Sequence, residues 1–274
     1  MRLTRFLALA LLVAPAVPAA PSGAQPADTT RISHAPLFTG RDLLVLGAFA
    51  AGTAVSFPLD RSIAERLQRK PNQDNRFLQR TAAIFRDLGH PGALIIGTSM
   101  YAVGRLAHVE RMADLGLHGT EALLVGAGVA SVIKVAAGRA RPYVDVENPE
   151  NFAFARGRRS DDYRSFPSGH SVAGFAAASA VVSETDRWWP GSTWYIAPVM
   201  YGGAALVATS RLYENKHWAS DVIVGAAIGT FAGTKIVRYH HSHPSNRVDR
   251  WLLSASIGSS ADGGYAFRWS ILPR

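Results

Sequence analysis

Six apolar stretches, separated by polar joints that carry glycine or proline, constrain the fold of this 274-residue chain more than any other feature. They are rich in alanine, glycine, leucine and valine, a composition and length typical of buried helices rather than strands. Their approximate bounds are 43–59, 92–106, 122–137, 172–183, 195–209 and 222–237. The sequence therefore predicts a mainly α fold, in which these helices pack into a single bundle.

The composition excludes several classes of protein. Hydrophobic residues make up 48% of the chain and charged residues 18%, which excludes a disordered chain. The sequence contains no cysteine, which excludes disulfide scaffolds, thiolate metal sites and cysteine nucleophiles. The formal net charge is +9, so anionic partners are expected: nucleic acid, phosphorylated substrates or acidic lipid head groups.

Residues 1–24 predict a signal peptide. Arg2 and Arg5 precede an apolar run over residues 6–17, and small residues suited to cleavage follow it. The alternative is an N-terminal membrane anchor, but the run is shorter than the ~20 residues that span a bilayer. We therefore expect export to the periplasm or cell envelope, with residues 25–41 forming a linker.

The relation of the helices to a membrane has two interpretations. The uncharged cores of the six stretches are mostly shorter than the ~20 residues needed for a span, and Lys134 and Arg105 lie inside or beside them. Glycine and alanine are nevertheless common where helices meet within membranes. The favoured interpretation is a periplasmic bundle in contact with anionic lipid, and the alternative is an integral inner-membrane protein.

The residue pattern changes from helix-like to strand-like after Pro244. Residues 251–257 and 265–271 have the pattern of two strands, and a glycine-rich turn joins them. The expected organisation is thus a helical domain over residues 42–243, followed by a small β-hairpin extension over residues 244–274.

The first of three polar motifs is Lys134-Val-Ala-Ala-Gly-Arg-Ala-Arg-Pro. Lys134 and Arg141 are seven residues apart, two helical turns, so both cations face one side. Pro142 ends the helix. The two cations suit phosphate oxygens, although two cations near a helix end more often belong to a solvated terminus. Arg139 lies between them and is interpreted as peripheral.

The second motif is Pro167-Ser-Gly-His, at the start of a helix rich in small residues. Ser168 is a good N-cap, and Gly169 lets a ligand approach the backbone closely. Amides at a helix start favour a bound anion. His170, in the first turn, can exchange a proton near neutral pH. Alone, the motif also fits an ordinary capped helix.

The third motif is Ser-Arg211-Leu-Tyr-Glu-Asn-Lys-His217-Trp-Ala-Ser-Asp221. His217 and Asp221 are four residues apart and would lie on one helix face. A carboxylate there can hold Nδ1–H of the imidazole and leave Nε2 as a nucleophile. A surface ion pair is the alternative for this pair alone.

Taken together in this order, the three motifs resemble the signature of the type 2 phosphatidic acid phosphatase superfamily, which also contains bacterial class A acid phosphatases and vanadium haloperoxidases. The resemblance covers residues 134–221, without a substitution at any signature position. It implies a helical bundle of this kind, and a metal-independent phosphatase that works through a phosphohistidine and is inhibited by vanadate, with no cofactor.

The resemblance also implies a role for each matched residue. His217 would attack phosphorus, Asp221 would orient it, and His170 would protonate the leaving group and then activate water. The remaining residues would bind the phosphate, namely Lys134, Arg141, Ser168, Gly169 and Arg211.

The leading hypothesis is therefore a hydrolase of phosphomonoesters or diphosphates, whose substrate is a phosphorylated small molecule or a lipid rather than nucleic acid. The alternatives are a vanadium-dependent haloperoxidase and a non-catalytic basic envelope protein. The sequence does not identify the substrate or the oligomeric state. His240, His241 and His243 precede Pro244 and are interpreted as the solvated end of a helix rather than as a metal site.

Overall fold

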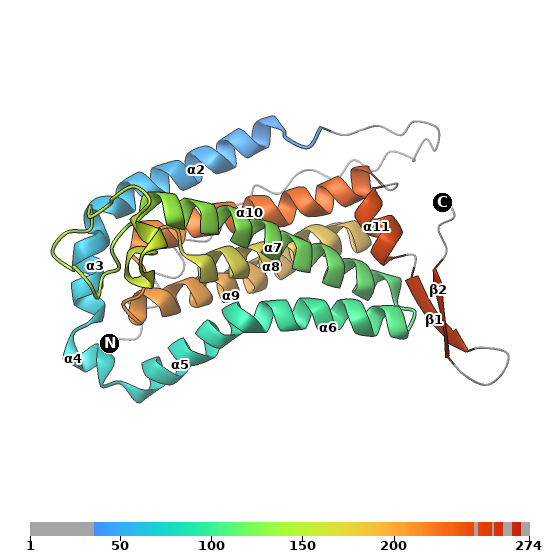
Figure 1. Ribbon diagram of the computed structural model, residues 1–274, viewed down its shortest axis with the longest axis horizontal. Coiled ribbons are helices and arrows are strands. Elements are labelled where there is room, and N and C mark those ends of the chain that lie inside the picture. The colour runs from blue at the N-terminus through green and yellow to red at the C-terminus, as the bar shows by residue number, and fades with distance from the viewer. Residues whose placement is uncertain (1–35, 244–245, 254, 260–264, 270–274) are drawn as a thin grey trace.

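The computed structural model describes residues 36–243, 246–253, 255–259 and 265–269, and the following statements concern this part of the chain. The predicted signal peptide, residues 1–24, lies outside the described residues, as do residues 25–35 of the predicted linker. Helices dominate the described chain and form one elongated bundle (Figure 1).

Seven helices of at least twelve residues build the bundle. They are α2 (Gly40–Ser56), α5 (Arg76–Asp87), α6 (Ala93–Leu106), α7 (Glu110–Ala137), α8 (Gly169–Trp188), α9 (Thr193–Tyr213) and α10 (Ala219–Ser242). Short helical elements connect or extend them: η1 (Phe57–Leu59), α3 (Asp60–Leu67), α4 (Lys70–Gln73), η2 (Leu88–Gly92), η3 (Arg156–Arg158), η4 (Asp161–Tyr163) and α11 (Arg247–Leu252).

Helix α8 lies at the centre of the bundle and packs against α7, α9 and α10. Its inner residues are small or aromatic, and Val172, Phe175 and Ala176 are completely buried. Around this core, α6 packs on α7, α5 on α9, and α2 on α10. The predicted single bundle is thus present, and α8 carries the second motif at its first residues.

Glycines bring α8 and α10 into backbone contact. Gly225, Gly229 and Gly233 lie at four-residue intervals on α10 and so form one stripe. A Cβ atom on Gly229 would lie 2.4 Å from the carbonyl oxygen of Val172, which is closer than real side chains approach. Because only glycine fits, the stripe sets the spacing between the helices that carry the second and third motifs.

The helices are longer than the apolar stretches that predicted them. The segment Gly40–Leu67 and α7 each contain 28 residues and α10 contains 24, and all three are long and apolar enough to cross a membrane. The helix lengths predicted from the sequence were too short, because α7 and α10 extend through polar residues beyond their apolar cores. Glu110 begins α7 and Ser242 ends α10.

At the C-terminal end, β1 (Ala255–Ser259) pairs antiparallel with β2 (Tyr265–Trp269). Ala255 stands opposite Trp269, and Ser259 opposite Tyr265. The connecting residues 260–264 and the last residues 270–274 lie outside the described chain. The strands project from the end of the bundle where α6 and α11 lie (Figure 1).

Candidate active site

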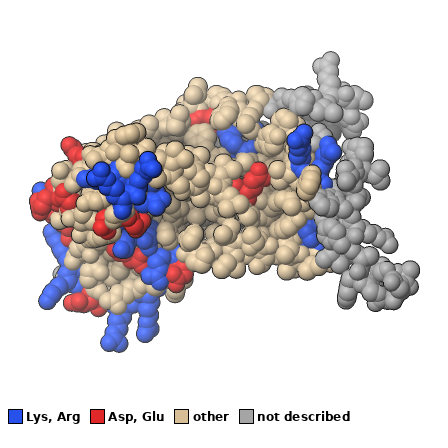
Figure 2. All heavy atoms as spheres, viewed as in Figure 1, with Lys and Arg blue, Asp and Glu red and all other residues tan. Residues whose placement is uncertain are grey.

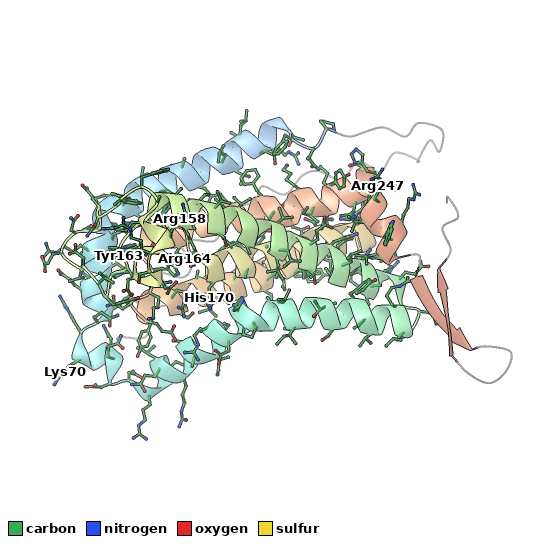
Figure 3. All side chains as sticks on the ribbon, in the orientation of Figure 1. Lys70, Arg158, Tyr163, Arg164, His170 and Arg247 are labelled. Carbon is green, nitrogen blue, oxygen red and sulfur yellow. The ribbon has the colours of Figure 1, made fainter. Side chains whose placement is uncertain are left out.

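The three motifs meet at one end of the bundle. Helices α7 and α9 run antiparallel to α8, and α10 runs parallel to α8. The C-terminal ends of α7 and α9 therefore lie beside the N-terminal ends of α8 and α10. Figure 3 places His170 at this end together with Arg158 and Arg164 of the α7–α8 loop. The eight predicted site residues all come from these helix ends or from the connections between them.

His217 lies just before α10 rather than within it. Trp218 is the N-cap residue, and Asp221 is the third residue of the helix. The His217 Nδ1 atom is 3.6 Å from Asp221 Oδ2, which is ion-pair distance but too long for a hydrogen bond. The imidazole is buried, with 3% of its side chain exposed. The carboxylate is therefore close enough to orient the ring after a small movement.

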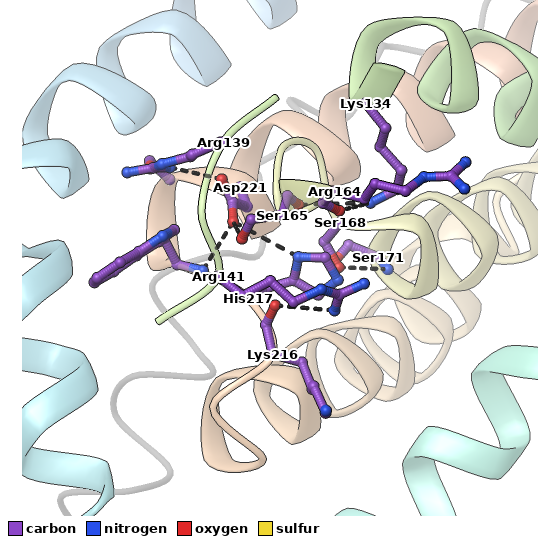
Figure 4. A network of polar contacts seen from close by, with 12 residues as sticks. Lys134, Arg139, Arg141, Arg164, Ser165, Ser168, Ser171, Lys216, His217 and Asp221 are labelled. Atoms are coloured by element: carbon purple, nitrogen blue, oxygen red, sulfur yellow. Dashed lines mark hydrogen bonds and ion pairs between the residues drawn. The ribbon is translucent and has the colours of Figure 1, made fainter. Parts of the chain in front are cut away.

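Asp221 is held rigidly by three donors (Figure 4). Its Oδ2 atom accepts hydrogen bonds from the Ser165 hydroxyl at 2.5 Å and from the Trp218 backbone N–H at 2.9 Å. Its Oδ1 atom pairs with Arg139 at 2.6 Å. The sequence did not identify Ser165, because nothing in its local pattern links it to residue 221.

The peripheral position assigned to Arg139 was wrong. Its guanidinium is completely buried and bridges Asp221 on α10 and Asp60 on α3, at 2.6 and 2.8 Å. It also donates to the Ser220 hydroxyl and to the Pro149 carbonyl oxygen. A fork with five donors can join two buried carboxylates in this way. Arg139 therefore positions Asp221, and Asp60 is a further residue that the sequence gave no reason to select.

The start of α8 has the geometry of an anion site. Ser168 caps the helix, because its hydroxyl accepts from the Ser171 backbone N–H, and its own N–H donates to the Asp221 carbonyl oxygen. The Lys134 side chain passes over Gly169, whose added Cβ would lie 3.8 Å from Lys134 Cε. The Lys134 side chain and the positive end of a helix dipole thus converge there.

Two arginines complete the cationic wall, and each pairs with an acidic residue. Arg141 pairs with Asp161 at 2.8 Å, and Asp161 is largely exposed. Arg211 pairs with Glu214, which Arg86 also contacts at 2.9 Å. A bound phosphate would compete with these carboxylates for the guanidinium groups.

The α7–α8 loop is a rigid frame, because several of its backbone carbonyl groups accept hydrogen bonds. Arg156 donates to the Gly138 carbonyl oxygen at 2.8 Å, and Lys134 donates to that of Arg164 at 2.8 Å. Among the basic residues of this loop, Arg156 therefore stabilises the loop itself, whereas the side chain of Arg158 is exposed.

Both candidate catalytic histidines are neutral near pH 7. The pKa of His217 is lowered to about 3, chiefly by burial and also by the nearby charges of Lys134 and Arg141, against the opposing effect of Asp221. Burial also lowers the pKa of His170 to about 3, together with the charge of Arg211. A neutral imidazole keeps the lone pair that a nucleophile or a base requires.

A third histidine lies beside His170. The ring of His90, from η2, is 5.8 Å from the His170 ring between centroids. Residue 90 belongs to none of the three motifs and is 80 residues away in sequence, so sequence patterns did not indicate it.

A second group of ionisable residues lies at the opposite end of the bundle. His240 is completely buried and contacts Glu121 and Asp249, each at 2.6 Å, while His241 contacts Glu184 at 2.9 Å. The interpretation as a solvated helix end was therefore wrong for His240 and His241, because carboxylates from α7, α8 and α11 contact them.

Comparisons with known proteins agree with the motifs. Residues 117–244 match the family model described as PAP2 superfamily. A lipid A 1-phosphatase of Porphyromonas gingivalis is 41% identical over 69 residues, which cover 25% of this chain and 15% of that protein. An undecaprenyl-diphosphatase of Sulfolobus acidocaldarius is 27% identical over 128 residues, 45% of this chain and 58% of that protein. The matches thus span less than two thirds of either relative.

The fold also has a solved counterpart. The crystal structure of a transmembrane PAP2-type phosphatidylglycerolphosphate phosphatase from Bacillus subtilis aligns with a TM-score of 0.52 and 18% sequence identity. The alignment covers 76% of this chain and 99% of that chain. At this identity the likeness concerns the arrangement of the helices.

Proposed function

Residues 117–244 belong to the PAP2 superfamily, and we propose that this chain is a metal-independent phosphatase of lipid-linked phosphomonoesters or diphosphates. The observation that carries the proposal is a buried, neutral His217, backed by Asp221 and facing Lys134 and Arg141. Such a site supplies a nucleophile and fixed positive charge, which are what phosphoryl transfer mainly requires.

In the first step, His217 Nε2 attacks phosphorus, and the bond between phosphorus and the leaving oxygen breaks. His170 donates a proton to that oxygen. The free site keeps His170 neutral, so the proton is taken up when the negative charge of the phosphoryl group offsets the surrounding cations. The product is a phosphohistidine on His217.

In the second step, the now neutral His170 accepts a proton from water as the oxygen attacks phosphorus and the P–N bond breaks. Lys134, Arg141 and Arg211, together with the Ser168 hydroxyl and the Gly169 amide, stabilise the charge on the phosphoryl oxygens in both steps. Asp221 keeps the His217 ring oriented, and Arg139 keeps Asp221 in place.

An apolar cavity beside His170 supports a lipid substrate. It has a volume of about 270 Å³ and lies between α6, α7, α8 and α9. Gly89 lines it, and a Cβ atom on Gly89 would lie 3.5 Å from the His170 ring, so the cavity begins next to the proposed acid. Ile96, Met100 and Val199 are among its other lining residues. An acyl or prenyl chain fits this surface better than a soluble sugar or nucleotide does.

The outer surface supports the interpretation that this is an integral membrane protein, rather than the peripheral attachment favoured by the sequence. Large apolar side chains face outward on several helices, with Leu44 of α2 73% exposed and Val132 of α7 71% exposed. In Figure 2, charged residues gather at the end that carries the active site, and the middle of the visible face is almost free of them. An uncharged belt bounded by a charged end is the pattern that a bilayer requires.

The proposal is tested with purified protein in detergent. Phosphate release from a long-chain lipid phosphate is expected in the presence of EDTA, with inhibition by vanadate, which mimics the five-coordinate transition state. Absence of phosphate release together with vanadate-dependent bromide oxidation would instead indicate a haloperoxidase.

The role of the cavity has its own test. Val199→Trp should obstruct the cavity, so KM for the lipid phosphate should rise at least tenfold while kinetics with p-nitrophenyl phosphate stay unchanged. The matched control is Val132→Trp, which alters an equally exposed valine away from the cavity. Equal effects of both variants on both substrates would exclude a lipid-tail site.

A further inference from the structure

Four helices bring imidazole and carboxylate groups together far from the active site. His118 lies in the first third of α7, Glu184 near the end of α8, His240 and His241 near the end of α10, and Asp249 in α11. Glu184 is fourteen residues after His170 on α8, or about 21 Å along the helix. Figure 3 shows the two ends, with His170 near one and Arg247 of α11 at the other.

The donor atoms of three residues converge on one point. His118 Nδ1 is 2.6 Å from Glu184 Oε1, and His241 Nε2 is 2.9 Å from Glu184 Oε2. Each residue offers one ligand atom, and all three atoms lie within 4.8 Å of one another. We propose that His118, Glu184 and His241 bind one divalent transition-metal ion, for which Zn²⁺ is the probe.

The donor set determines the class of metal. Two imidazole nitrogens and one carboxylate suit zinc or a neighbouring first-row metal, whereas Mg²⁺ and Ca²⁺ prefer oxygen ligands alone. Ligands at ~2.0–2.1 Å in a tetrahedron lie about 3.3 Å apart. The present separations of 2.6 and 2.9 Å would therefore widen by about 0.7 and 0.4 Å on metal binding.

The surroundings resemble the outer shell of a metal site. The other ring nitrogen of His118, Nε2, faces Asp249 Oδ1 at 3.5 Å, and a metal-binding histidine usually directs its second N–H to a carboxylate. His240 differs from the three ligands, because carboxylates occupy both of its nitrogens at 2.6 Å. It therefore serves as a bridge between Asp249 and Glu121 rather than as a ligand.

Burial and ring contacts hold the proposed ligands close together. The side chains of His118 and Glu184 are at most 3% exposed. The His118 ring stacks on His240 at 4.1 Å and meets His241 edge-on at 5.5 Å between centroids. A divalent cation between His118 and His241 would balance the charge of the Glu184 carboxylate, which contacts both rings.

Such an ion would join α7, α8 and α10 at the end opposite the active site. Because binding to the folded state alone stabilises the fold, Zn²⁺ at a hundredfold excess over Kd should raise Tm by about 5–10 °C for a chain of this size. The experiment uses the full chain in detergent, treated with a chelator and then titrated with Zn²⁺, with bound metal measured by mass spectrometry.

One zinc per chain is expected in the wild type and in His217→Ala, whose altered residue lies at the other end. His241→Gln and Glu184→Gln should each lose the bound zinc and the rise in Tm. The matched control is His243→Gln, because His243 stacks on Tyr239 and hydrogen-bonds Ser242 rather than Glu184. Zinc retained equally by both ligand variants would overturn the proposal, and so would wild-type protein that neither binds zinc nor gains stability from it.

Discussion

At the scale of single residues, the site depends on buried charges that fix one another. Arg139 is the clearest case, because its fork joins Asp60 and Asp221 with no exposure to solvent. Lysine would keep the charge but could not reach both carboxylates with the same geometry. Breaking a buried ion pair leaves an uncompensated charge and costs about 3–5 kcal/mol.

Arg139→Lys should therefore lower both Tm and kcat/KM, the latter by about tenfold or more, since Asp221 would lose its anchor. Arg158→Lys, in an exposed position of the same loop, should leave both quantities unchanged. The two variants are compared by thermal unfolding in detergent and by phosphate release. Wild-type values for Arg139→Lys would mean that Asp221 is held adequately by Ser165 and Trp218 alone.

The histidines of the site make stability dependent on pH. The pKa of His170 and of His217 is about 3 in the folded protein, below the ordinary value of 6.5. The unfolded chain therefore binds more protons between these values, and folding stability falls as pH decreases from 6.5 towards 3. Each histidine contributes a slope of up to about 1.4 kcal/mol per pH unit.

His217→Gln removes one of these groups, so its Tm should fall less steeply than that of the wild type between pH 6.5 and 4. The comparison is made by thermal unfolding at several pH values in one detergent. Parallel curves for the two proteins would show that His217 is not held neutral by its surroundings.

At the scale of the helices, the glycine stripe on α10 fixes where α8 presents Ser168 and His170 relative to His217. Gly229 lies two turns beyond Asp221, and its Cβ would clash with the backbone of α8 at Val172 and Ala176. Overpacking of this kind usually costs about 1–3 kcal/mol.

Gly229→Ala should accordingly lower Tm and also reduce kcat, although no catalytic group is touched. Gly128→Ala on α7 is the control, because a Cβ atom there meets nothing within 4 Å, and alanine favours the helix by up to ~1 kcal/mol. Unchanged activity in a folded Gly229→Ala protein would show that the site tolerates a wider spacing of α8 and α10.

The helices also show which parts of the structure can be predicted from sequence patterns. Lys134, Ser168 and His217 were identified because each lies in a short contiguous motif next to a helix end. Asp60 and His90 were not, because their partners are 79 and 80 residues away and only the folded bundle joins them. The length of α7 was underestimated for a related reason, since His118 and other polar residues are buried against partners from distant helices.

At the scale of the whole molecule, the long helices and their outward-facing apolar side chains predict residence in a bilayer. Three segments are long and apolar enough to span one, and their exposed apolar residues would be unfavourable in water. The sequence-based expectation of a periplasmic bundle in contact with anionic lipid rested on apolar stretches shorter than these helices.

The protein should remain entirely in the membrane fraction after alkaline carbonate and after 1 M salt, at which screening is nearly complete, and should dissolve only in detergent. A peripheral protein of known behaviour in the same membranes serves as the control. Release of a large fraction by carbonate would contradict the bilayer assignment without affecting the chemistry at His217.

The phosphohistidine itself provides the most direct test of the proposed chemistry. With p-nitrophenyl phosphate the leaving group needs little help from an acid, whereas hydrolysis of the intermediate still requires His170 as a base. Rapid acid-free quenching of His170→Gln should therefore trap an acid-labile phosphate on His217, accompanied by a burst of p-nitrophenol, and His217→Ala should show neither. A phosphoenzyme that persists in His217→Ala, or steady turnover in that variant, would contradict nucleophilic attack by His217.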